Sequence, residues 1–114
     1  MARHTTKVGT LTIGTGAGVY SNVISKRELG LATGFLFHAP VAFTGTVSVH
    51  AGPNVGDTSS TVLPLSSGGT AVVIVGALST YWAIGGFNSI CLKTSGTEAA
   101  PRVVQLYAIL DIPG

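Results

Sequence analysis

The sequence predicts an all-β protein, a single-domain antiparallel β-sandwich that is jelly-roll-like and has about eight strands. Short stretches of alternating apolar and polar residues recur along the 114 residues, separated by turns rich in glycine, proline and hydroxyl residues. No stretch shows a convincing helical apolar period. The length suits one domain, and an eight-stranded sandwich of this kind is typically a jelly roll.

The first strand is expected at residues 7–13, after a polar segment without apolar periodicity. We therefore divide the chain into an N-terminal arm, residues 1–6, and a β-sandwich domain, residues 7–114. The arm is expected to be flexible unless another surface holds it. Residues 14–18 superficially resemble a glycine-rich phosphate loop, but the next segment, residues 19–25, favours a strand over the helix that such a loop requires.

The segment after these strands contains the only charge cluster, at residues 25–30, which suits one helical turn or a polar loop. Strands are then expected at residues 31–38 and 43–50. Phe35 and Phe37 share one face of the first of these strands, which indicates that this face points into a core.

A long loop is expected at residues 51–69, with a short edge strand inside it at residues 61–65. Loops of this length are usually functional or disordered. Residues 70–78 form a nearly continuous apolar run rich in β-branched side chains. Such a run is typical of a strand that is covered on both faces.

The clearest pattern is strand, turn, strand at residues 89–110, which we interpret as a hairpin. One face of its second strand is wholly apolar and is expected to point into the core: Val104, Leu106, Ala108 and Leu110. The other face is mixed, and it is too apolar for free solvation: Val103, Gln105, Tyr107 and Ile109. We therefore expect this sheet to pack on something besides its own core.

Charge is unusually scarce in this chain. Charged residues make up 9% of it, against about 25% in ordinary soluble domains. Between Leu29 and Leu92 the only Asp, Glu, Lys or Arg is Asp57. Because charge normally keeps domains separate, such a surface favours a protein that works inside an assembly. A small β domain with hydroxyl-rich faces is the simpler alternative.

Several partners and features are not expected. The net charge of +2, without a basic stripe interleaved with aromatics, argues against a nucleic-acid partner. Prolines, glycines and hydroxyls interrupt the apolar stretches, which argues against a membrane partner. The N-terminus shows no signal peptide, so an exit from the cell is expected only by lysis or inside a particle. The single Cys91 excludes an internal disulfide.

Catalysis needs convergent titratable groups, and the sequence does not indicate any. We therefore expect no enzyme activity, no catalytic residue, no metal and no cofactor. The four carboxylates fall in expected turns or near the C-terminus: Glu28, Asp57, Glu98 and Asp111. His38 and His50 end consecutive strands of an expected hairpin, one beside the turn and one at the far end, too far apart to share a metal ion.

Seven side chains are candidates for partner binding: Arg3, His4, Lys7, Tyr81, Trp82, Gln105 and Tyr107. The first three bring positive charge to the arm and its junction with the domain, and the last two lie on the mixed face. The adjacent aromatic pair suits a protein interface or stacking on a sugar ring, although Trp82 could equally fill the core.

The terminal strand–turn–strand unit resembles small virion proteins of tailed bacteriophages, and most nearly the jelly-roll head decoration, or cement, proteins. The resemblance covers about a fifth of the chain and rests mainly on one turn: Ser95, Gly96, Thr97, Glu98, Ala99 and Ala100. It implies a structural virion protein that binds the major capsid protein on the capsid outer surface, often as a dimer or trimer. Such a protein stabilises the assembled head by its binding free energy. The alternative is a carbohydrate-binding or adhesive β-sandwich module of a phage tail or fibre.

Overall fold

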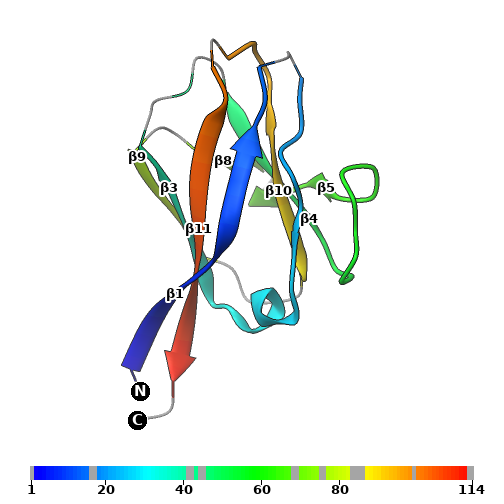
Figure 1. Cartoon of the computed structure of the whole chain (residues 1–114). Coiled ribbons are helices and arrows are strands. Elements are labelled where there is room, and N and C mark those ends of the chain that lie inside the picture. The colour runs from blue at the N-terminus through cyan, green and yellow to red at the C-terminus, as the bar shows by residue number, and fades with distance from the viewer. Residues whose placement is uncertain are drawn as a thin grey trace.

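The computed structural model describes residues 2–15, 18–40, 43, 46–67, 70–74, 77–82, 87–98 and 100–112. These residues form two antiparallel sheets packed face to face, which confirms the predicted all-β sandwich (Figure 1). The strands are β1 (Ala2–Ile13), β2 (Ile24–Ser25), β3 (Gly34–Ala39), β4 (Val47–Gly52), β5 (Leu63–Pro64), β6 (Ser66–Ser67), β7 (Thr70–Ala71), β8 (Val73–Ile74), β9 (Ala77–Trp82), β10 (Ser89–Thr94) and β11 (Arg102–Ile112).

The strand order is that of a jelly roll. One sheet has the order β1-β11-β3-β9, the other has the order β2-β10-β4-β5, and β8 also pairs with β4. β5 and β8 both pair with β4, so we count them as one strand of the sandwich. Counted in this way, the two sheets contain eight strands in chain order, and their pairing is nested. The first pairs with the last, the second with the seventh, the third with the sixth and the fourth with the fifth. This nesting is the eight-stranded double Greek key.

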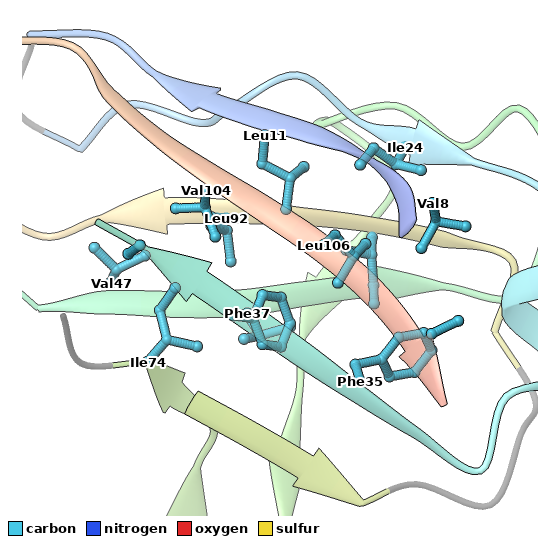
Figure 2. Close-up of a cluster of buried hydrophobic side chains, with 14 of the residues drawn as sticks. Val8, Leu11, Ile24, Phe35, Phe37, Val47, Ile74, Leu92, Val104 and Leu106 are labelled. Atoms are coloured by element: carbon cyan, nitrogen blue, oxygen red, sulfur yellow. The ribbon is translucent and has the colours of Figure 1, made fainter. Parts of the chain in front are cut away.

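The core lies between the two sheets and contains the inward faces that the alternation predicted. Phe35, Phe37 and Leu106 are fully or almost fully buried, and Figure 2 shows them gathered between the strands. Val104 and Ala108 are also fully buried, which confirms the apolar face of the last strand. Each large apolar side chain buried in this way contributes about 1.5–3 kcal/mol.

Both expected hairpins are wrong. β10 pairs with β2 and β4, while β11 pairs with β1 and β3 in the opposite sheet, so residues 89–110 cross from one sheet to the other. The turn after β10 bonds instead to the start of β4: Ser95 N–H donates to Thr46 O (2.8 Å), and Thr46 N–H donates to Ser95 Oγ (3.1 Å). Likewise β3 and β4 are in different sheets. Alternation marks a strand's inward face, but it does not select the neighbouring strand.

The apolar run at residues 70–78 is not one strand covered on both faces. β8 pairs with β4 in one sheet, and β9 pairs with β3 in the other. Ile74 is buried, whereas Val73 is 46% exposed. The run therefore contributes short strands to both sheets of the sandwich.

The segment expected to be a separate arm forms the first half of β1. Residues 2–6 pair with residues 108–112 of β11 within the same chain. In Figure 1 this part of β1 and β11 continues beyond the other strands toward the labelled N and C ends. β3 pairs with β11 only between Gln105 and Ile109. The first residues of β1 (2–4) and the last residues of β11 (110–112) therefore pair only with each other and form a two-stranded ribbon.

The long loop before β5 is ordered by one carboxylate. Asp57 Oδ2 accepts from Asn54 N–H (3.0 Å), and Asp57 Oδ1 accepts from the Thr61 hydroxyl (3.2 Å). Gly52 lies directly beneath the same carboxylate, where a Cβ would overlap it. β5 confirms the expected short edge strand inside this loop.

The turn before β11 contains a buried ion pair. Arg102 Nε lies 3.0 Å from Glu98 Oε1, and the Glu98 side chain is completely buried. Of the two alternatives for the charge cluster at residues 25–30, a helical turn or a polar loop, the structure shows the helical one as η1, a 3-10 helix at Arg27–Leu31. In the described part of the chain, no helix is long and apolar enough to cross a membrane.

Candidate functional site

The outward face of the four-stranded sheet brings together side chains from three strands. Gln105 on β11 lies between Thr10 on β1 and His38 on β3. The Thr10 hydroxyl donates to Gln105 Oε1 over 2.8 Å, which fixes the orientation of the amide. His38 is exposed, and Gln105 is half-buried. This part of the face presents an oriented amide beside an accessible imidazole.

The same face continues one residue pair further along. Tyr107 lies between Lys7 on β1 and Leu36 on β3. Lys7 is exposed, while Tyr107 and Leu36 are half-buried. Val103, at the other end of the row, is 42% exposed. We call the described side chains of this surface the sheet face: Lys7, Thr10, Leu36, His38, Val103, Gln105 and Tyr107.

Three of the seven candidate side chains therefore meet on one surface, and they are Lys7, Gln105 and Tyr107. His4 is exposed on the ribbon, opposite Leu110, and the backbone of Arg3 pairs with Asp111. The structure places Lys7 beside the mixed face of the last strand, because β1 and β11 are paired neighbours, whereas His4 alternates to the opposite face of the sheet.

The aromatic pair lies on β9, the strand at the far edge of the same sheet. In the backbone register Tyr81 pairs with Phe35, and Trp82 pairs with Gly34. The side chains of Tyr81 and Trp82 lie outside the described part of the structure. Whether Trp82 contributes to the core or to an interface therefore stays a prediction.

The mixed face of β11 has one end that the chain itself covers and another part that is open. Ile109 is only 7% exposed, although it alternates with the accessible Val103 and Tyr107. Thr33 N–H donates to Ile109 O over 2.8 Å, and η1 lies against β11, so the chain itself covers this end. The rest of the face is open to a partner, which narrows the expected contact area to the sheet face.

The outer surface of the second sheet holds a buried imidazole. His50 is 5% exposed, lies in edge-to-face contact with Tyr20 and shares a 3.1 Å hydrogen bond between its Nε2 and Ser48 Oγ. Ser48 Oγ also lies 3.3 Å from Lys93 O, a second acceptor for the hydroxyl proton. Burial, and secondarily the Lys93 charge, lowers the pKa of His50.

The described hydrogen bond of the imidazole is the one between its Nε2 and the Ser48 hydroxyl. His50 Nδ1 is buried without a hydrogen-bond partner among the described residues. Within the described residues, no three His, Cys, Asp or Glu side chains gather closely enough to hold a metal ion.

A shallow apolar pocket lies at the free edge of the second sheet. It has a volume of about 250 Å³ and is lined by Ala51, Gly52, Pro53, Leu63, Pro64, Leu65 and Phe87. Leu63 is 71% exposed at its rim. Every residue that lines it has an apolar side chain or is glycine, so its polar surface comes from backbone atoms.

Sequence reasoning missed Thr10, Leu36 and His38 as members of the sheet face. Alternation along each strand gives the side chains that share a face, which is the signal that could have suggested them. It does not show that β11 lies between β1 and β3. That neighbour relation places Thr10 and His38 on either side of Gln105.

Comparison with known proteins shows the fold alone. No protein-family model matches the chain, and no curated protein matches it. The crystal structure of SPBc2 prophage-derived protein YomS is similar, with a TM-score of 0.55 and 9% sequence identity. The similarity covers 95% of this chain and 93% of YomS, so the two proteins share the architecture over nearly their whole lengths.

Proposed function

We propose that this chain is a structural, non-enzymatic protein of a phage particle. The observation that carries the proposal is the fold similarity, over 95% of the chain, to a prophage-derived protein. The sparse charge of the chain and the resemblance of residues 89–110 to virion proteins support the same class. Within this class, the role that fits best is a decoration protein that binds the major capsid protein on the outer surface of the assembled head.

The sheet face is the surface that would meet the capsid. It combines accessible apolar groups, Val103 and Tyr107, with the oriented amide of Gln105 and the ammonium group of Lys7. Aromatic anchors surrounded by polar groups are typical of protein interfaces. Many copies that each bind only the assembled lattice would stabilise it by mass action, without nucleic acid or membrane as a partner.

Co-sedimentation with heads of the phage whose genome encodes this chain tests the proposal. We expect saturable binding to assembled heads and no binding to unassembled capsid subunits. Tyr107→Glu should weaken binding at least about tenfold, because it places a charge at the centre of the proposed contact. Lys93→Glu, on the other sheet, is the matched control and should bind normally. Equal binding of both variants would remove the sheet face from the contact.

A carbohydrate-binding or adhesive module of a tail or fibre is the competing role. A glycan array separates the two roles: binding of a specific sugar that is lost in Trp82→Ala would favour the tail or fibre. The proposal also includes self-association as a dimer or trimer, for which a two-fold dimer is the default symmetry. A monomer in sedimentation at high micromolar concentration would contradict a constitutive oligomer.

A further inference from the structure

β1 is the outer strand of its sheet, so one row of its backbone N–H and C=O groups faces away from β11. Side chains cover this row in the second half of the strand. Asn22 Nδ2 donates to Thr10 O (2.9 Å), and Thr12 N–H donates to Asn22 Oδ1 (2.7 Å). Lys26 Nζ donates to Val8 O over 2.8 Å. The Asn22 amide thus bonds to β1 as the peptide group of a neighbouring strand would.

The first half of β1 is different. The register shifts at a bulge between Lys7 and Gly9, and the covered groups all lie from Val8 onward. Among the described residues, no side-chain hydrogen bond reaches the outer edge of residues 2–7. Residues 2–4 of this half also run beyond the end of β3 (Figure 1). We call residues 2–7 of β1 the open edge.

We propose that the open edge accepts an extended, carboxylate-bearing strand of a different protein by β-strand addition. In this mode, backbone hydrogen bonds supply affinity and alternate side chains supply specificity. The open edge contains Arg3, His4 and Lys7 and no acidic residue, and the exposed Lys7 and His4 are accessible to an incoming strand. In the backbone register Arg3 is opposite Asp111, whereas Lys7 is opposite the uncharged Tyr107.

Charge also argues against a second copy as the occupant. In an antiparallel pairing of two open edges centred on Thr5, Arg3 of one copy would face Lys7 of the other. Like charges directly opposite each other in a sheet are destabilising, whereas opposite charges stabilise. A third strand would also support the ribbon, since a two-stranded ribbon is only marginally stable in water. The inference does not depend on the proposed virion role.

The probe is a short synthetic peptide in which Glu alternates with Val and Thr. Amide hydrogen exchange of the full chain, with and without the peptide, should show slower exchange at alternate amides of the open edge. A peptide that is N-methylated at every residue should give no protection, because neither of its edges keeps an N–H donor. A peptide with Lys in place of Glu should bind more weakly.

Charge reversal tests the specificity. Exposed ion pairs contribute up to about fivefold each in affinity. Arg3→Glu combined with Lys7→Glu should therefore weaken binding of the Glu peptide by up to about 25-fold and strengthen binding of the Lys peptide. Lys93→Glu is the control and should leave both affinities unchanged.

Three results would overturn the proposal. The first is no protection of residues 2–7 by the Glu peptide, and the second is equal protection by the N-methylated peptide. The third is protection that appears in the protein alone, rises with its concentration and accompanies a dimer in sedimentation. That last result would identify a second copy as the occupant.

Discussion

Replacing Arg102 by Met should destabilise the fold strongly. The substitution removes the guanidinium group and keeps most of the aliphatic stem, so the completely buried Glu98 carboxylate loses its contact with Arg102. Breaking a buried ion pair by removing one partner costs about 3–5 kcal/mol. The Arg102 side chain is 16% exposed, which gives water some access and favours the lower end of that range.

Urea unfolding measures this loss directly, as a lower midpoint with an unchanged slope. We expect a loss of about 3 kcal/mol for Arg102→Met. The double variant with Glu98→Gln should lose less than Arg102→Met alone, because the buried charge is then absent as well. Lys93→Met is the matched control: its ammonium group lies 5.0 Å from the centroid of the Tyr20 ring, a contact that contributes about 0.5–1 kcal/mol.

Two outcomes would refute the reasoning. Arg102→Met could cost no more than the Lys93→Met control, which would mean that solvent or other groups stabilise the Glu98 carboxylate without Arg102. Alternatively, the two single effects could simply add in the double variant. Additivity would show that the 3.0 Å contact between Arg102 Nε and Glu98 Oε1 carries no coupling energy.

Three further predictions concern His50, Cys91 and Gly52. The pKa of His50 is lowered below 6.5 by burial and by Lys93, so the unfolded chain takes up the proton first, and stability should fall as the pH drops below about 6.5. Urea unfolding at several pH values should show this slope in the native chain and a flatter one in His50→Gln; equal slopes would contradict it. Burial raises the pKa of Cys91 to about 11, so an aromatic disulfide reagent at about pH 8 should react only after unfolding, and reaction of the folded chain at the rate of a free thiol would contradict it. Gly52→Ala should cost about 1–3 kcal/mol, because the new Cβ overlaps the Asp57 carboxylate, and adding Asp57→Ala should recover part of that loss; full stability of Gly52→Ala alone would rule out the close approach.

The sequence by itself determined the fold class and most of the core. The period-two alternation identified the inward faces of β3 and β11, and Phe35, Phe37 and Leu106 are buried as expected. The sequence shows this pattern because adjacent side chains of a strand point to opposite faces, so apolar residues recur at every second position of a strand with one buried face. The sequence also indicated the short edge strand β5. The local charge cluster suited either a helical turn, which η1 is, or a polar loop.

Only the tertiary structure decided which strands are neighbours. The chain after β10 and the chain after β3 each cross to the opposite sheet, and residues 2–6 pair with the end of β11. The sheet face and the open edge of β1 both follow from those choices. Alternation fixes the side of a strand that faces the core, but the partner strand is set by how two whole sheets fill one interior, which no local stretch of sequence encodes.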